Sequence, residues 1–197
     1  MALWLVRPAY VAAEVVTAAA TTGGYSFVDD TVSDLGATGC DAAYCSPRHA
    51  LMNGSFVGFG ILLALGALLL APRIGRLSTV LLVVAGVSSV AVGLAPVDQD
   101  AGLHTLAATP LFVAQPIALL VLSRVLRSRA LLAGGLLTAV GAIGFVLVDG
   151  GAGSGALERL ALWPVLAALA LVAVRVRGGK HTVPTVRERR VAPTVEE

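Results

Sequence analysis

Residues 51–97 read LMNGSFVGFGILLALGALLLAPRIGRLSTVLLVVAGVSSVAVGLAPV, and this stretch decides the fold class. It contains two apolar runs, each close to the roughly 20 residues that an α-helix needs to cross the hydrocarbon core of a bilayer. The residues between the runs hold the only charged side chains of the stretch, Arg73 and Arg76. We therefore predict two membrane-spanning helices joined by a short basic loop.

Apolar runs of similar length continue on both sides of this stretch. Two of them carry no charged residue, and the outermost two carry a few. The first run also resembles a cleaved signal peptide, but Glu14 would interrupt the apolar core that such a peptide requires. We predict an all-α, polytopic transmembrane bundle of six helices in residues 1–177, followed by a disordered basic tail at 178–197. The predicted spans are 3–23, 51–71, 77–97, 103–123, 130–148 and 157–176, with an outer loop at 24–50.

The composition excludes a soluble domain. Hydrophobic residues make up 57% of the chain and charged residues 13%, with a mean hydropathy of +0.87, whereas globular proteins carry about 25% charged residues. No nucleotide-binding motif is present, and we expect membrane lipids and no nucleic acid as partners. The abundance of Ala, Val, Gly and Arg is typical of a high-GC bacterial genome.

The charges are distributed asymmetrically between the two sides of the predicted spans. Twelve of the 14 basic residues lie on one side, and eight of the 12 acidic residues lie on the other. Because Lys and Arg in short loops stay in the cytoplasm, we predict that both termini are cytoplasmic and that loop 24–50 lies outside. This would be a multi-pass protein of the bacterial cytoplasmic (inner) membrane.

The outer loop contains both cysteines of the chain, Cys40 and Cys45. In an oxidising compartment they can form a disulfide, which is the interpretation we favour. A zinc site with His49 and His104, or two free thiols, are the alternatives. The loop also has a pattern typical of a short amphipathic helix ending at Gly36, with apolar residues on one face and carboxylates on the other.

Glu14 is the most unusual residue of the predicted spans. An ionisable group within the membrane is a functional candidate by default, and Glu14 shares a helical face with Arg7 and Tyr10. One interpretation is that Glu14 packs in the bundle interior, where it is neutral or hydrogen-bonded. The other is that it serves as a proton or cation relay, or as an anchor for a ligand. We slightly favour packing.

Further polar residues gather at the predicted outer mouth. His49 and Asn53 share a helical face there, and His104 opens a span that Gln115-Pro116 should bend. We hypothesise that Asp34, His49, Asn53 and His104 converge on one outward-facing cavity with Glu14 below it; a merely wet rim is the alternative. The candidate ligand-binding residues are Glu14, Asp30, Ser33, Asp34, Arg48, His49, Asn53, Asp98 and His104.

Several short motifs resemble those of a known family. They are Thr31–Gly36 after the first span, Asn53–Val57 opening the second, Gly93–Pro96 ending the third, and His104 opening the fourth. In combination they resemble the prokaryotic six-span membrane family known as "domain of unknown function 998". A looser similarity runs to six-span eukaryotic proteins of the Frag1 and Sfk1 type. The resemblance implies a six-span fold and no particular reaction.

Three functions remain open. We favour a non-enzymatic protein, without cofactor, that binds or handles a lipid or small polar ligand at the outer leaflet, or assists a membrane partner. The first alternative is a metal-assisted intramembrane lipid hydrolase, because Ser33, Asp34, His49 and His104 are similar in kind to the complement of alkaline-ceramidase-like enzymes. Against it, the last two spans lack the histidines that those enzymes use. The second alternative is an assembly subunit of a larger complex or a homo-oligomer, packed through small-residue faces such as Gly54–Gly58.

Overall fold

The computed structural model describes residues 2–178, and within them it contains α-helices, one 3₁₀ turn and no β-strand. Five of the helices are long and apolar enough to cross a membrane. The prediction of an all-α, polytopic transmembrane bundle is therefore confirmed, and the protein is an integral membrane protein. The predicted tail lies outside the described residues, apart from Gly178. The five long helices are α3 (His49–Ile74), α4 (Arg76–Leu94), α5 (Ala101–Val125), α6 (Arg129–Val148) and α7 (Ser154–Gly178).

The first predicted span, 3–23, is not one continuous helix. It consists of α1 (Ala2–Leu5) and α2 (Ala9–Ala18), separated by a turn at residues 6–8. Pro8 has no N–H to donate into a helix, so the chain continues through short-range bonds from Ala9 N to the Val6 carbonyl and from Tyr10 N to that of Arg7, both 3.0 Å. Both short helices pack against α3.

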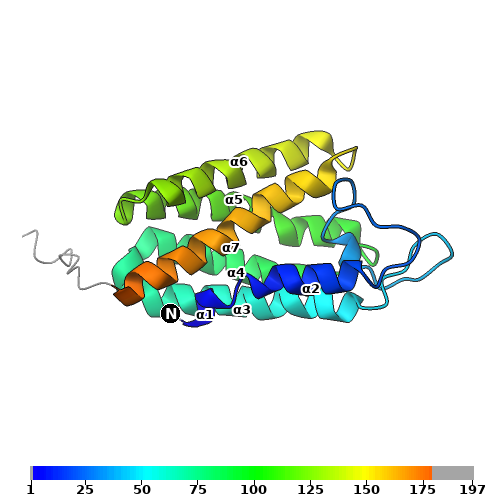
Figure 1. The fold of residues 1–197 in the computed structure, drawn as a ribbon, viewed down its shortest axis with the longest axis horizontal. Coiled ribbons are helices and arrows are strands. Elements are labelled where there is room, and N and C mark those ends of the chain that lie inside the picture. Colours follow the sequence, from blue (N-terminus) through cyan, green and yellow to red (C-terminus); the bar gives the residue numbers. More distant parts are fainter. Residues whose placement is uncertain (1, 179–197) are drawn as a thin grey trace, which may run out of the picture.

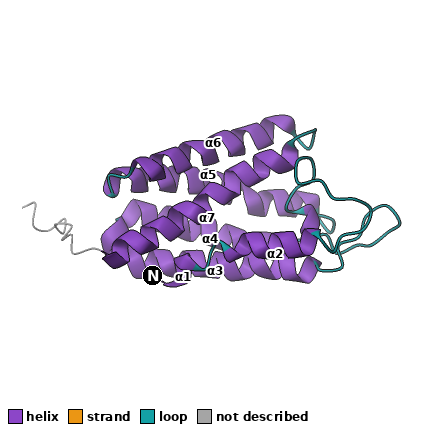
Figure 2. Ribbon diagram, viewed as in Figure 1, coloured by secondary structure: helices purple, strands orange, loops and turns teal. Residues whose placement is uncertain are grey.

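Consecutive helices run up and down and pack side by side from α3 to α7 (Figure 1). α7 slants across the bundle between the α5–α6 pair and α2–α3, and it closes the ring by contacting α1. Both ends of the described chain lie at one end of the bundle, called the tail end below. The loops at residues 19–48, 95–100 and 149–153 gather at the opposite end, called the loop end (Figure 2).

The outward faces of the long helices are apolar, as expected for surfaces that contact lipid. Leu106 and Leu147, for example, are 70% and 78% exposed. Inside, one core fills the tail half, where the Trp4 indole packs on Gly66 so closely that a Cβ there would lie 2.1 Å from it. A second core fills the loop half around Tyr10 and surrounds the features described below.

α3 and α4 approach most closely at a pair of glycines. A Cβ on Gly60 would lie 2.6 Å from the Gly86 carbonyl oxygen, and a Cβ on Gly86 would lie 2.6 Å from that of Gly60. The small-residue motif Gly54–Gly58 makes no such contact within the described chain, because nothing lies within 4 Å of a Cβ at either of its glycines. Its use in packing against a partner stays a prediction.

The long connection between α2 and α3 folds down into the loop end instead of forming an amphipathic helix. Within it only Asp34–Gly36 is helical, as the 3₁₀ turn η1, while Val32 and Leu35 are fully buried in the bundle. The Asp34 carboxylate accepts hydrogen bonds from the Thr31 N–H (2.7 Å) and hydroxyl (2.8 Å), which closes a tight turn where the predicted helix would continue. The predicted disulfide between Cys40 and Cys45 is confirmed.

Candidate functional site

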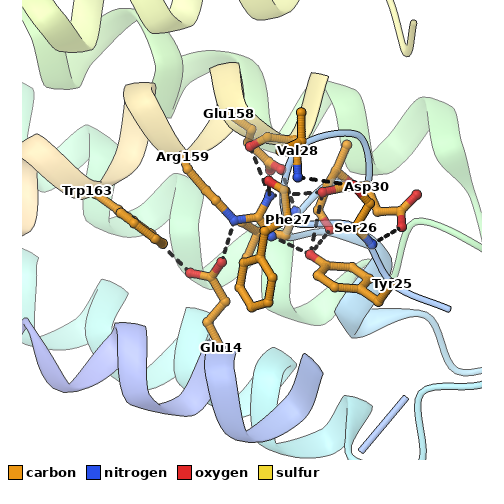
Figure 3. Close-up of polar contacts among 12 residues, drawn as sticks. Glu14, Tyr25, Ser26, Phe27, Val28, Asp30, Glu158, Arg159 and Trp163 are labelled. Atoms are coloured by element: carbon orange, nitrogen blue, oxygen red, sulfur yellow. Dashed lines mark hydrogen bonds and ion pairs between the residues drawn. The ribbon is translucent and has the colours of Figure 1, made fainter. Parts of the chain in front are cut away.

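A buried arginine on α7 organises the loop end (Figure 3). The Arg159 Nε donates to Glu14 Oε1 on α2 at 2.7 Å, and both side chains are nearly inaccessible to solvent. The second oxygen of Glu14 accepts from the Trp163 indole at 3.0 Å, one turn further along α7. This carboxylate therefore bridges α2 and α7.

The remaining donors of Arg159 hold the α2–α3 connection. Nη1 donates to the carbonyls of Phe27, Asp30 and Gly155 at 2.8–2.9 Å, and Nη2 donates to the Tyr25 hydroxyl. The guanidinium carbon also lies 4.8 Å from the centroid of the Phe27 ring, within cation–π range. Every arm of the guanidinium is thus used, and the buried charge is paired and hydrogen-bonded as its burial requires.

Glu158, the neighbour of Arg159, anchors the same connection further along. Its Oε2 accepts from the Val32 N–H at 2.5 Å, and its Oε1 lies 3.4 Å from the Ser33 hydroxyl oxygen. Glycine at position 155 permits this fit, because a Cβ there would lie 2.1 Å from the Asp30 carbonyl oxygen. The first turns of α7 and residues 25–35 therefore form one interlocked unit.

Ser33 and His104 face one another across this unit. His104 Nε2 lies 2.9 Å from the Ser33 Oγ, and its Nδ1 lies 2.6 Å from the Ala95 carbonyl oxygen at the end of α4. His104 is buried, in the first turn of α5, whereas Ser33 is half-buried at the start of η1. We call these two residues the Ser33–His104 pair.

A cavity between α2, α3, α4, α5 and α7 is lined at one end by Ser33, the serine of this pair. This central cavity is narrow, with a volume of about 50 Å³, and its wall is mainly apolar. Ser33 lies at its loop end, and Gln115, about 20 Å along α5 from the first residue of that helix, lies at its deep end. Its polar wall residues are Arg7, Tyr10, Ser33, Ser89, Gln115 and Glu158.

Three polar groups of the central cavity lack partners. Arg7 Nε, the Tyr10 hydroxyl and Gln115 Oε1 are buried and have no hydrogen bond to any described residue. Arg7 Nη1 donates to the Phe59 carbonyl at 2.8 Å, yet the ion pair of the described chain belongs to Arg159 and not to Arg7. A cation without a carboxylate and two further unsatisfied groups thus line one mostly apolar space.

Comparison with known proteins identifies the family. The model of the family described as "Protein of unknown function (DUF998)" matches residues 5–175, which is most of the chain. The chain belongs to the DUF998 family. This confirms the resemblance drawn from the short motifs. Neither a curated protein nor a solved structure matches the chain.

The predicted site residues of this DUF998 chain occupy several separate networks. Ser33 meets His104, and the Asp30 carbonyl meets the arginine that holds Glu14. The others make local contacts. His49 Nδ1 is hydrogen-bonded to the Ser46 carbonyl, and Asn53 donates to the Gly36 carbonyl. Asp34 accepts from Thr31 within its own turn, and Asp98 accepts from Thr38 and Gly39. Arg48 is exposed.

Asp98 ties the disulfide loop to the α4–α5 connection. Its carboxylate accepts from the N–H groups of Thr38 and Gly39 and from the Thr38 hydroxyl, at 2.8–3.0 Å. Partial burial opposes ionisation, but these hydrogen bonds prevail and hold the pKa of Asp98 below its usual range. Nearby, burial raises the pKa of Tyr44 to about 12, so its hydroxyl stays protonated and donates to the Asp34 carbonyl at 3.1 Å.

Within residues 2–178 no group of three or more His, Cys, Asp or Glu side chains is arranged to hold a metal ion. Cys40 and Cys45 are bonded to one another, so their sulfurs are not thiolate ligands. His104 directs its two ring nitrogens to Ala95 and Ser33. The zinc alternative therefore lacks the ligand set from which it was inferred.

Sequence reasoning missed the residues that hold the site together. Glu158 and Arg159 stand at the edge of the last apolar run and were not among the candidate residues, yet both are buried. Arg7 was not a candidate either, and its guanidinium reaches Phe59 near the middle of α3. The sequence could have indicated them. An ionisable residue within the membrane is a functional candidate, and this applies to charges at the edge of an apolar run as it does to Glu14.

Proposed function

We propose that this DUF998 protein binds a single-chain, acidic amphiphile in the central cavity and thereby handles a lipid in one leaflet of the membrane. The observation that carries the proposal is the set of unpartnered groups: Arg7 Nε, the Tyr10 hydroxyl and Gln115 Oε1 line one apolar space. The apolar wall suits a hydrocarbon chain, and the cation suits an acidic group. By the charge bias of the loops, this would be the outer leaflet.

The energetic argument concerns the empty protein. A buried polar group without a partner costs about 1–3 kcal/mol, and an unpaired charge costs more. A ligand carboxylate can accept from Arg7 Nε and the Tyr10 hydroxyl, and the Gln115 amide can turn its NH₂ group toward the same carboxylate. A neutral hydrocarbon satisfies none of these groups, which is why an acidic head group is favoured.

The wall of the cavity also indicates a route of entry. Phe59, Ala108, Phe112 and Leu162 line the cavity and are only half-buried. Ala108 lies about 10 Å along α5 from its first residue, at a rise of about 1.5 Å per residue, and therefore at the depth of the acyl chains. An amphiphile would enter sideways from the hydrocarbon region.

Native mass spectrometry with added oleate tests the proposal. We expect wild-type protein to retain oleate, and Arg7→Gln and Gln115→Leu to retain it about 10-fold less, because a hydrogen bond to a charged group contributes about 1.5–3 kcal/mol. Thr138→Ala is the matched control, since Thr138 Oγ1 is also buried and unpartnered but does not line the cavity. Oleyl alcohol, which lacks the acid, should bind more weakly than oleate.

Equal retention of oleate by all four proteins would contradict the proposal. Stronger binding of oleyl alcohol than of oleate would contradict the role of Arg7. Thermal unfolding of each variant in the same detergent separates a loss of binding from a loss of fold.

A further inference from the structure

The proton positions of the Ser33–His104 pair follow from its neighbours. A carbonyl oxygen can only accept a hydrogen bond, so the 2.6 Å contact with the Ala95 carbonyl places a proton on His104 Nδ1. In the neutral imidazole, Nε2 then carries the lone pair, and it faces the Ser33 Oγ at 2.9 Å. The single hydroxyl proton of Ser33 points to this nearer acceptor, because Glu158 Oε1 is farther away at 3.4 Å.

This arrangement differs from that of buried serines in the described chain. Ser46, Ser55 and Ser89, for example, donate to main-chain carbonyls, which are not bases. Ser33 instead bonds an imidazole and lines the central cavity. A nucleophile within about 2.6–3.2 Å of a base that a third group orients is the signature of an activated serine.

We infer that Ser33 is the nucleophile and His104 the general base of an acyl-transfer activity on a carboxylic ester of an amphiphile. The inference deepens the proposed function and rests on it for the substrate class, since the ester must lie where the central cavity meets Ser33. The Ala95 carbonyl takes the orienting role, and the bond from Val32 N to Glu158 fixes the residue that precedes the nucleophile.

The chemical steps balance with water as the second substrate. Ser33 Oγ attacks the ester carbonyl carbon, forming the Oγ–C bond, while its proton passes to His104 Nε2. The bond from that carbon to the alkoxy oxygen breaks, and the leaving alcohol takes the proton from His104. Water then adds to the acyl-serine with His104 again as base, which releases a carboxylic acid and regenerates the hydroxyl of Ser33. The acid is an amphiphile of the kind that Arg7 and Gln115 suit.

Phosphorylation of the serine by diisopropyl fluorophosphate tests the pair directly. Ser33 Oγ forms the O–P bond, fluoride leaves, and His104 takes the proton, so the reaction reports nucleophilicity and needs no acyl chain in the cavity. We expect mass spectrometry to locate the adduct on Ser33 of the full chain in detergent. Labelling should be absent in Ser33→Ala and about 100-fold slower in His104→Gln, which can accept the hydroxyl hydrogen bond but is not a base.

Ser55→Ala is the matched control and should be labelled as fast as wild type, because Ser55 is buried on α3 outside the cavity. Hydrolysis of 1-oleoylglycerol in mixed micelles, followed by oleate release, should depend on Ser33 in the same way. A wild-type protein that unfolds cooperatively but gains no adduct on Ser33 would overturn the inference. Wild-type labelling of His104→Gln would overturn the assignment of the base.

The two proposals fail separately. If the protein retains oleate but diisopropyl fluorophosphate does not modify Ser33, the amphiphile site stands and the inferred activity is wrong. If the reagent modifies Ser33 but the protein retains no oleate, the activated serine stands and the proposed function is wrong.

Discussion

A charge inside a membrane span is costly unless the protein supplies partners, and both oxygens of the Glu14 carboxylate have one. Its two oxygens are taken by Arg159 and Trp163, both on α7. Its position within an apolar run predicts that it needs a partner in the bundle. The run cannot show which one, because Arg159 is 145 residues away and lies in a different span.

Replacing one residue of this ion pair should lower the free energy of unfolding far more than replacing both. We predict that Glu14→Ala lowers the free energy of unfolding by about 3–5 kcal/mol, because Arg159 is left buried without a counter-charge. Glu14→Leu combined with Arg159→Met should recover much of that loss, since two apolar side chains need no partner. Thermal unfolding in a mild detergent measures both.

Recovery should be incomplete, because Arg159 also holds the carbonyls of residues 27, 30 and 155. A double variant less stable than Glu14→Ala would show that these main-chain contacts, and not the ion pair, dominate. Glu14→Ala at wild-type stability would show that the pair contributes nothing.

At the scale of elements, the position of a helix crossing depends on the rotation of each helix, which a small-residue motif leaves open. Gly54–Gly58 has the expected spacing and faces away from the bundle, whereas Gly60 and Gly86 form the contact between α3 and α4. The spans themselves could be predicted, because each is recognised from the hydropathy of its own residues alone. Pro8, by contrast, breaks the first span in a way that hydropathy does not register.

The two kinds of glycine should respond oppositely to a methyl group. Gly86→Ala places a Cβ 2.6 Å from a carbonyl oxygen of α3, and we predict a loss of about 1–3 kcal/mol from overpacking. Gly58→Ala meets nothing within 4 Å and should be neutral, or stabilising by up to about 1 kcal/mol through its higher helix propensity. Unfolding temperatures of the two variants, measured side by side, compare them; equal values would refute the crossing at Gly86.

At the scale of the whole molecule, both ends of the described chain lie at the tail end of the bundle (Figure 1). This arrangement supports our prediction of an even number of membrane crossings, six if α1 and α2 together form one. The basic connections at Arg73–Arg76 and Arg124–Arg129 also lie at this end. The positive-inside bias predicts that this end faces the cytoplasm.

Reporter fusions test that orientation. We expect fusions of a fluorescent protein after Gly75, Ser128 or Gly179 to fluoresce, and fusions of alkaline phosphatase after Thr38, Asp100 or Gly153 to be active, because each reporter works on one side of the membrane only. Each junction carries the other reporter as its control. Phosphatase activity after Gly179 would reverse the predicted orientation, and a single discordant junction would refute six spans.

The sequence by itself determined that the protein is a helical membrane bundle and roughly where five of its spans lie. It also favoured the pairing of Cys40 with Cys45 and indicated the family to which the chain belongs. These properties depend on the hydropathy summed over one segment, on residues close together in the sequence, or on short motifs. Each of these can be recognised within a single stretch of the sequence. Only the tertiary structure decided that Arg159 pairs with Glu14, that Ser33 meets His104 from 71 residues away, and that a cavity joins Ser33 to Gln115. Such contacts depend on how the helices rotate and tilt against one another, and many packings bury the same apolar residues, so hydropathy alone does not select among them.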